Sequence, residues 1–390
     1  MLSLAPTAAP FVIGVPFVDR HFQSLMHAPL HQRMSTREVA AHLAAAAAHF
    51  PFLSGTTYHE LLALIHAELG HAEALDDFQP YGAHYAKAVG PEKILHIISG
   101  HTPAAGLQSI IRGLLLGSRN FCKVPSSGLP EIAEFRDWLP ESLADRIEIK
   151  RELTSDWIEE ADAVIVFGTD TTIAKVRSYI RPGQIFLTYG QKLSFGVIFH
   201  DPAFASAPGA ARDASIFDQQ GGLSPHVFFV ANDPLAYAAK LAAEMERLHQ
   251  RRPRGALSLS DANAIRNLRT ELSFRLANDE PVALFQSPDS TAWAVAFDAQ
   301  PGFPASPLNR FIFVKPFPKD FVETFAHVRP HLSCAGIWPA TLENARALAE
   351  AGVSRICPVG HMQLPPVTWH QYGQPVLTPL VRWIDCETGG

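Results

Sequence analysis

Apolar runs of strand length alternate with stretches of helical spacing along most of the chain from Lys93 onward. The run KILHIISG ends in glycine, HTPAAGLQSIIRGLLLG has apolar residues at helical intervals, and NFCKVPS is again strand-like. Further along, ADAVIVFG, TDTTIAKVRSYI and GQIFLTYG repeat the order strand, helix, strand. This alternation predicts an α/β fold with a parallel sheet covered on both faces by helices.

The chain before Lys93 has a different pattern, which predicts mainly helices. Ser35 and Glu38 have capping-box spacing ahead of VAAHLAAAAAHF, and Thr57 and Glu60 repeat it ahead of LLALIHAELG. An extended, proline-rich arm is expected before these helices.

A second α/β lobe is expected to begin near Phe204. HVFFVAND has the pattern of a strand, and Asp233 with Pro234 provides an N-cap and a first-turn proline for a long helix. The expected organisation is an N-terminal arm with helices packed on the cofactor lobe (1–92), a nucleotide-binding domain (93–203), a catalytic-type α/β domain (204–365) and a C-terminal tail (366–390).

The composition is that of a folded protein with a sizeable core. Of the 390 residues, 47% are hydrophobic and 18% are charged, and the formal net charge is −6. Because no basic block could follow a phosphate backbone, nucleic acid is not an expected partner.

The cysteines and the N-terminal segment indicate a cytoplasmic protein without an integral membrane segment. The 4 cysteines lie far apart and show no CxxC spacing, as expected of reduced thiols. The opening MLSLAPTAAPFVIGVPF lacks a preceding basic residue and is interrupted by prolines, so neither a signal peptide nor a spanning helix is expected. His327 and His331 have i, i+4 spacing, but Pro330 lies between them and disfavours a regular helix, so no metal is expected.

Glycine at the end of two apolar runs marks a candidate anion site. No GxGxxG motif is present, but Gly168 and Thr169 place backbone N–H groups at the start of a helix, where a pyrophosphate is stabilised. Such turns often merely cap helices, so this observation is weak when it is taken alone.

The order of several motifs strengthens the prediction of an anion site at Gly168. ISGHTP, SRNFCKVPS, VIVFGTDTTIAK, LTYGQKLSFGVI and FDQQGGLSPHVFFV follow one another, with GHMQLPPVTWHQYGQPVLTPLVRW near the end. From about Lys93 onward the chain resembles the aldehyde dehydrogenase superfamily and, more closely, the LuxC-type acyl-CoA reductases, which make fatty aldehydes from activated acyl groups. The resemblance implies two Rossmann-like α/β lobes with a helical N-terminal region, and an acyl-CoA or other acyl thioester as substrate.

The resemblance also implies residues for the adenosine end of a nicotinamide cofactor. Lys123 matches the lysine that holds the ribose in that superfamily. Ser126 and Ser127 stand where an acidic residue usually disfavours a phosphorylated ribose. Because no carboxylate repels a 2′-phosphate there, NADPH is the expected cofactor, and NADH remains an alternative.

For the reactive end of the cofactor, Gly168 and Thr169 match the turn under the pyrophosphate, and Tyr189 with Gly190 matches the segment beside the nicotinamide. Thr188 stands where ordinary aldehyde dehydrogenases have a glutamate that activates water. A lone hydroxyl is a poor general base, and this departure favours a thioester-exchanging reductase over acid-forming oxidation.

The resemblance further implies a nucleophilic cysteine between FDQ and SP, and Gly222 stands at its position. Losing the covalent step is expected to cost on the order of 10⁴ to 10⁶ in rate. His101 replaces the asparagine whose amide helps to bind the oxyanion. It either donates to that oxygen or is an ordinary turn histidine.

Three functions stay open from the sequence. The first is an acyl-CoA reductase with weak activity, by direct hydride transfer or with a substitute thiol such as Cys357. The second is a pseudoenzyme that binds acyl-CoA or NADP(H) without turnover. The third is a thioester hydrolase in which His101 activates water. A homo-oligomer also stays open, since the family's oligomers often form by pairing edge strands, but no such strand can be singled out from this sequence.

Overall fold

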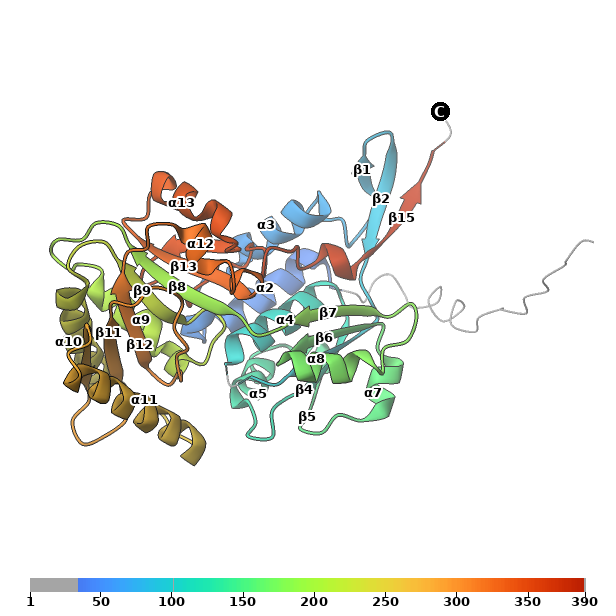
Figure 1. The fold of residues 1–390 in the computed structure, drawn as a ribbon. Helices are drawn as coiled ribbons and strands as arrows, with labels where there is room; N and C mark the ends of the chain where they lie inside the picture. Colours follow the sequence, from blue (N-terminus) through green and yellow to red (C-terminus); the bar gives the residue numbers. More distant parts are fainter. Residues whose placement is uncertain (1–33, 101, 389–390) are drawn as a thin grey trace, which may run out of the picture. The chain divides into compact units, whose positions relative to one another are not determined.

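The computed structural model describes residues 34–100 and 102–388. The chain divides into two compact units, Met1–Ser35 and Thr36–Gly390, and the fold below is that of the second (Figure 1). The expected proline-rich arm lies outside the described residues.

Within the described residues, the first large sheet has five parallel strands in the order β5-β4-β3-β6-β7. The strands are β3 (Lys93–Ile98), β4 (Arg119–Lys123), β5 (Ile147–Lys150), β6 (Ala163–Phe167) and β7 (Ile185–Tyr189). The order reverses between β3 and β6. Ligands of open α/β sheets bind at the carboxyl ends of such a pair, because the loops that follow diverge to opposite faces.

Amphipathic helices connect these strands. Proline begins the longest one, as expected for a residue whose fixed φ suits the first turn. The helices are α4 (Pro103–Leu115), α5 (Pro130–Asp137), α6 (Glu141–Ala144), α7 (Ser155–Glu160) and α8 (Asp170–Arg177).

The second large sheet has seven described strands in the order β10-β11-β12-β9-β8-β13-β14, and β10 with β11 is its antiparallel pair. The strands are β8 (Leu193–Ile198), β9 (Pro225–Val230), β10 (Val282–Gln286), β11 (Ala294–Asp298), β12 (Phe311–Pro316), β13 (Leu332–Trp338) and β14 (Arg355–Pro358).

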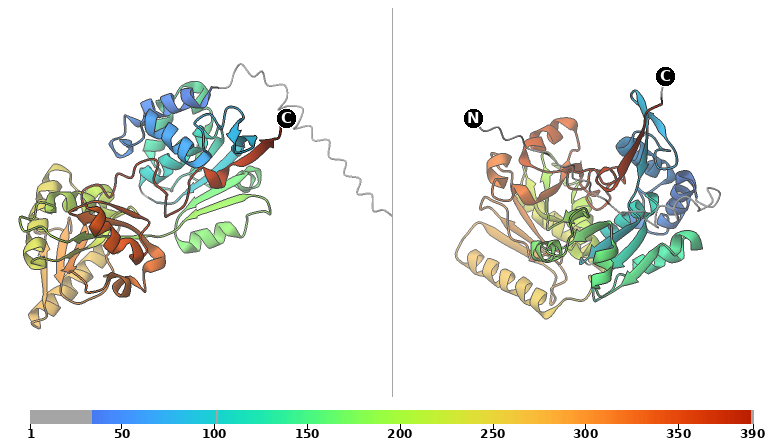
Figure 2. Two further views of the ribbon diagram at one scale, coloured as in Figure 1. Left: turned by 90° about the horizontal axis from the view of Figure 1, so that it is seen from above. Right: turned by 90° about the vertical axis from the view of Figure 1, so that its right-hand side faces the viewer.

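Helices cover both faces of this sheet (Figures 1 and 2). Along β9, Val227 and Phe229 enter one core cluster, while Phe228 and Val230 enter the other, as the two-residue period of a strand requires. The helices are α9 (Ala207–Ser215), α10 (Pro234–Arg251), α11 (Leu259–Ala277), α12 (Phe321–Phe325) and α13 (Leu342–Leu348).

The chain passes from the first large sheet to the second between Tyr189 and Leu193. Strand β8 is hydrogen-bonded to β9 and β13, so it belongs to the second sheet. The boundary expected at residue 203 therefore lies one strand too late with respect to the sheets. An apolar run such as LSFGVIF predicts a buried strand but does not show which sheet it joins.

The N-terminal region contains the two expected helices, α2 (Thr36–Ala47) and α3 (Tyr58–Leu69). Thr57 caps α3, since its hydroxyl accepts a hydrogen bond from the Glu60 N–H at 3.3 Å. The region also holds an unexpected hairpin of β1 (Gln79–Tyr81) and β2 (His84–Val89). β15 (Arg382–Cys386) pairs with β2 in a small antiparallel sheet (Figures 1 and 2).

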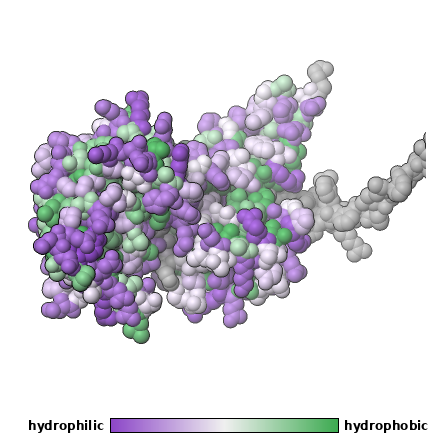
Figure 3. All heavy atoms as spheres, in the orientation of Figure 1, coloured by the Kyte–Doolittle hydropathy of each residue, from purple (hydrophilic) through white to green (hydrophobic). Residues whose placement is uncertain are grey.

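Short 3-10 turns complete the described elements: Pro51–Leu53, Ile216–Gln219, Arg329–His331, Ala349–Ala351 and Thr378–Leu380. On the face shown in Figure 3, hydrophilic side chains cover much of the surface around α10 and α11, interrupted by small hydrophobic patches. Among the described residues, no helix combines the length and the apolar character needed to span a membrane.

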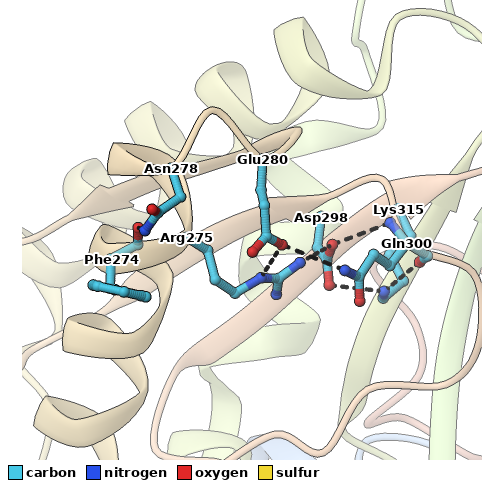
Figure 4. A network of polar contacts seen from close by, with 7 residues as sticks. All are labelled: Phe274, Arg275, Asn278, Glu280, Asp298, Gln300 and Lys315. Atoms are coloured by element: carbon cyan, nitrogen blue, oxygen red, sulfur yellow. Dashed lines mark hydrogen bonds and ion pairs between the residues drawn. The ribbon is translucent and has the colours of Figure 1, made fainter.

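A buried ion network joins α11 to strands β11 and β12 (Figure 4). The Asp298 carboxylate lies 3.1 Å from Lys315 Nζ and 3.1 Å from Arg275 Nη2, and Arg275 Nε lies 2.8 Å from Glu280. Burial alone would raise the pKa of Asp298, but these partners hold it below its ordinary value. The network's contribution to stability is therefore present above the ordinary carboxyl pKa and is lost as pH falls through the folded-state pKa.

Asp298→Ala is expected to lower the free energy of unfolding by about 3 to 5 kcal/mol, because it leaves the buried Lys315 ammonium without its counter-charge. Urea unfolding at neutral pH measures this loss. Glu280→Ala is the matched control, since Glu280 is 38% exposed and an exposed ion pair contributes about 1 kcal/mol or less. Equal losses for the two variants would contradict the prediction.

Candidate functional site

The loop between α9 and β9 has an unusual backbone. Phe217, Asp218 and Gln219 have φ values of 55°, 51° and 65°, in the left-handed region. This region costs a residue with a side chain roughly 1 to 2 kcal/mol. Such strain persists where surrounding contacts enforce it, and functional sites often contain it.

The Asp218 carboxylate provides the strongest of these contacts. It accepts hydrogen bonds from Arg310 Nε at 2.8 Å and from the Gly255 N–H at 3.0 Å, and Arg310 Nη2 lies 2.7 Å away. The Arg310 side chain is only 2% exposed. This ion pair, buried on the Arg310 side and partly exposed on the Asp218 side, ties the loop to the segment before β12.

That segment is itself left-handed over three residues, since Leu308, Asn309 and Arg310 have φ values of 59°, 58° and 66°. Gln220 Nε2 donates to Asn309 Oδ1 at 2.7 Å. Gln219 is fully buried, and its amide donates to two main-chain carbonyls, those of residues 225 and 311. Two strained segments therefore hold each other in place.

The adjacent glycines at the end of this loop lie close to side chains of neighbouring segments. The Gly222 carbonyl accepts a hydrogen bond from the Ser194 hydroxyl at 2.8 Å. A Cβ placed on Gly222 would lie 3.0 Å from Tyr372 Oη and 3.7 Å from Lys192 Cβ. A side chain at this position would therefore point toward Tyr372.

Both glycines border a cleft of about 650 Å³ that also contains the Gly168 turn. Its walls come from the carboxyl ends of β3, β6 and β7, from the start of β8 and from the loop. The lining residues that bear on function are Ser99, Gly168, Thr169, Tyr189, Gly190, Lys192, Gly221, Gly222, His226 and Tyr372.

The Gly168 turn lies where the strand order of the first sheet reverses. A Cβ on Gly168 would lie 2.7 Å from Ser99 Oγ and 3.2 Å from Thr172 Cβ, so a larger residue here would displace these side chains. Thr169 caps α8 by accepting a hydrogen bond from the Thr172 N–H at 3.2 Å. The turn fits the pyrophosphate of a nicotinamide dinucleotide, although the Asp170 carboxylate in the first turn of α8 weakens the local positive potential.

A second, smaller pocket of about 60 Å³ lies beside the same loop. Its lining is mainly apolar and includes Phe217, Leu223, Pro365 and Trp369. Residues common to this pocket and the cleft are Thr102, Ala105, Gly221, Gly222 and Tyr372. The cleft and the apolar pocket therefore adjoin each other at Gly222.

Several residues singled out from the sequence do not line either cavity. Lys123 is half-buried at the end of β4, and Ser126 and Ser127 are exposed in the turn that follows. Thr188 is half-buried in β7, beside the cleft residue Tyr189. His101 lies outside the described residues.

Three of the four cysteines, Cys122, Cys334 and Cys357, are buried, and Cys386 is half-buried at the end of β15. Burial raises the pKa of the Cys122 thiol well above its ordinary value. Cys334 Sγ lies 3.7 Å from Cys357 Sγ, and both pack with Met362 against Leu223. Neither of these two thiols lines a cavity at the loop. Cys357 is therefore not placed to substitute for a nucleophile at Gly222.

Sequence reasoning missed Tyr372, Lys192 and His226. Tyr372 belongs to WHQYGQ and His226 to SPH, motifs that carried the family resemblance without an assigned role. Burial lowers the pKa of His226 to about 4, so its imidazole is neutral near pH 7. Among the described residues, no group of three or more His, Cys, Asp or Glu side chains could hold a metal ion.

Comparison with known families agrees with this geometry. The family model described as acyl-CoA reductase (LuxC) matches residues 15–383. The chain belongs to the LuxC family. A long-chain acyl-protein thioester reductase of Aliivibrio fischeri is 25% identical over 340 residues, covering 83% of this chain and 70% of that protein. A second such reductase, from Photobacterium leiognathi, is 23% identical over 352 residues, with the same coverage.

Solved structures place this LuxC-family chain in the aldehyde dehydrogenase fold. The NAD-dependent benzaldehyde dehydrogenase of Corynebacterium glutamicum superposes with a TM-score of 0.60 at 13% identity, over 94% of this chain and 88% of that one. Aldehyde dehydrogenase 21 of Physcomitrella patens gives 0.62 at 11% identity, over 91% and 87%. The family and the fold class predicted from the sequence are therefore confirmed.

Proposed function

We propose that this LuxC-family protein reduces acyl thioesters, such as long-chain acyl-CoA or an acyl-protein, to aldehydes with NADPH. One observation carries the proposal: a single cleft contains both the Gly168–Thr169 turn and the Gly222 loop. The bacterial relatives are long-chain acyl-protein thioester reductases, which supports the substrate class. An NADP-dependent glyceraldehyde-3-phosphate dehydrogenase of Bacillus halodurans shares the fold, with a TM-score of 0.58.

In this proposal the chain's residues divide between the two substrates. Gly168 and Thr169 receive the pyrophosphate, Tyr189 and Gly190 flank the nicotinamide, and Lys123 holds the adenosine ribose. When bound, the cofactor supplies a hydride. The apolar pocket beside Gly222 receives the acyl chain next to the thioester carbonyl.

Gly222 determines the character of the reaction. With no thiol at this position, the protein forms no acyl-enzyme there, so the carbonyl is reduced while it is still attached to its carrier thiol. We expect a slow reductase. Formation of aldehyde from long-chain acyl-CoA and NADPH, followed by mass spectrometry, tests the proposal, and its absence at high protein concentration would refute it.

Cofactor choice gives a separate prediction. Ser126→Glu is expected to weaken NADPH binding about tenfold or more, because the new carboxylate repels the 2′-phosphate. NADH binding should change little. Equilibrium titration of both cofactors measures the two effects, with Ser178→Glu, on the exposed end of α8, as the control. Equal weakening of NADPH and NADH would show that position 126 does not face a 2′-phosphate.

The absence of a nucleophile at Gly222 also favours one alternative, a pseudoenzyme that binds acyl-CoA or NADP(H) without turnover. A ligand of the folded state at 100 times its Kd stabilises it by about 2.7 kcal/mol. Thermal stabilisation without aldehyde formation would support this alternative. Release of CoA without NADPH would instead indicate the thioester hydrolase that uses His101.

The small sheet of β1, β2 and β15 supports a homo-oligomer as part of this proposal. It exposes Tyr81, Tyr85, Trp383 and Ile384, which are large apolar or aromatic side chains. Apolar side chains exposed along short edge strands favour association with another chain. Sedimentation of the purified protein measures its oligomeric state.

A further inference from the structure

Tyr372 lies directly opposite the glycine that stands at the nucleophile position. Its hydroxyl oxygen would be 3.0 Å from a Cβ on Gly222, and its side chain lines both the cleft and the apolar pocket. A substrate carbonyl beside Gly222 therefore lies within reach of this hydroxyl.

The ring of Tyr372 is held in a fixed orientation. It packs edge-on against Tyr189 and Trp369, with ring centroids 5.6 and 6.3 Å away. Lys192 Nζ lies 5.1 Å from the ring centroid. These contacts position the phenol before a substrate arrives, which is what a proton donor requires.

The backbone around Tyr372 is equally well defined. Its φ of 55° is left-handed, and Gly373, with φ 82°, donates its N–H to the carbonyl of His370 at 3.0 Å. The neighbouring Gln371 accepts a hydrogen bond from the buried Arg112 of α4 at 2.5 Å. The turn is thereby anchored to the helix that follows β3.

The hydroxyl itself is available for a ligand. It makes no hydrogen bond to any other described residue, and the side chain is half-buried where it lines the cleft. Burial raises the pKa of Tyr372 to about 12, and Tyr189 adds to the rise. The phenol therefore stays protonated near pH 7 and is a hydrogen-bond donor.

We propose that the Tyr372 hydroxyl is the proton donor to the carbonyl oxygen of an acyl thioester bound beside Gly222. This inference rests on the proposed reductase function. It assigns a catalytic group to a site that has glycine where the family resemblance implies a thiol.

In the proposed step the carbonyl carbon gains a hydride and the carbonyl oxygen gains a proton. With a hydride supplied to the carbonyl carbon by a bound reduced nicotinamide, the carbonyl π pair would move to oxygen, and Tyr372 would donate its hydroxyl proton to that oxygen to give a hemithioacetal. The tyrosinate then takes back the hydroxyl proton while the carbon–sulfur bond breaks. The sulfur leaves with the electron pair and is protonated by water. The sum is thioester, reduced cofactor and one proton giving aldehyde, thiol and oxidised cofactor.

Tyr372→Phe tests this role, because it keeps the ring and removes only the hydroxyl. Aldehyde formation is expected to fall about 100-fold, as is typical when a general acid is lost. The Kd of NADPH and the melting temperature should stay close to those of the native chain. Tyr85→Phe, in the small sheet, is the control and should retain full activity. Undiminished activity in Tyr372→Phe would overturn the inference while leaving the reductase proposal intact.

A second measurement does not depend on turnover. In a Gly222→Cys background, the pH dependence of alkylation by iodoacetamide gives the pKa of the introduced thiol. A hydrogen bond from Tyr372 stabilises the thiolate, so Tyr372→Phe is expected to raise that thiol pKa by about one unit. An unchanged thiol pKa in Tyr372→Phe would show that the hydroxyl does not reach position 222. Absence of aldehyde from the native chain would refute the reductase proposal and, with it, the proton-donor role.

Discussion

Gly222→Cys is expected to accelerate aldehyde formation from long-chain acyl-CoA and NADPH on the order of 100-fold, because it restores a nucleophile that can hold the acyl group as a thioester. The full acceleration of a native cysteine site is not expected. The new Cβ would lie 3.0 Å from Tyr372 Oη, so the phenol must shift by a few tenths of an ångström. Initial rates and intact-protein mass spectra measure the acceleration and the acyl adduct.

Gly221→Cys is the matched control for this variant. It places a thiol one residue earlier, where the Cβ would lie 3.3 Å from the Gln363 amide oxygen instead of facing Tyr372. We expect neither acceleration nor a stable acyl adduct from it. If Gly222→Cys also showed no adduct and no gain, Gly222 would not occupy the nucleophile position.

Asp218→Ala is expected to lower the free energy of unfolding by about 3 to 5 kcal/mol, because the Arg310 guanidinium would remain buried without its partner. The variant also releases the contact that holds Phe217, Asp218 and Gln219 in the left-handed region, so aldehyde formation should fall with stability. Urea unfolding and the reductase assay on the same preparation measure both effects. Asp137→Ala, at an exposed position in α5, is the control.

The double variant Asp218→Leu with Arg310→Met separates charge from packing. Replacing both members of a buried ion pair with apolar residues is often close to neutral in stability. We expect it to recover most of the stability lost in Asp218→Ala but not the activity, since the loop loses its polar anchor. Recovery of both would show that the ion pair does not shape the loop.

Much of the fold could be predicted from the sequence because its central strands are buried on both faces. Apolar runs such as KILHII and HVFFV therefore stand out without alternation. The residues 282–286 and 294–298 were not predicted as strands, and β10 is only partly buried. The hairpin of β1 and β2 was missed because β1 has only 3 residues and because β2 pairs with β15, about 300 positions away.

The candidate site could be predicted only as far as local motifs extend. Gly168, Thr169, Tyr189 and Gly190 follow parallel strands, whose carboxyl ends must share one edge of the sheet. The left-handed Phe217 carries no local signal, because its conformation is imposed by contacts with distant segments. Tyr372 reaches the site from the far end of the chain, and no local pattern reveals such an approach.

The passage from β7 into β8 has a mechanical consequence. Residues 190–192 join the two large sheets directly, and the chain leaves the second sheet after β14 and pairs again with β2 through β15. Both crossings border the cleft, since one carries Lys192 and the other carries Tyr372. A hinge rotation that opened the cleft would move both side chains at the same time. Tyr372 would then leave its position opposite Gly222, so opening of the cleft to release the oxidised nucleotide would disrupt the proton-donating arrangement. Closure of the cleft would restore it.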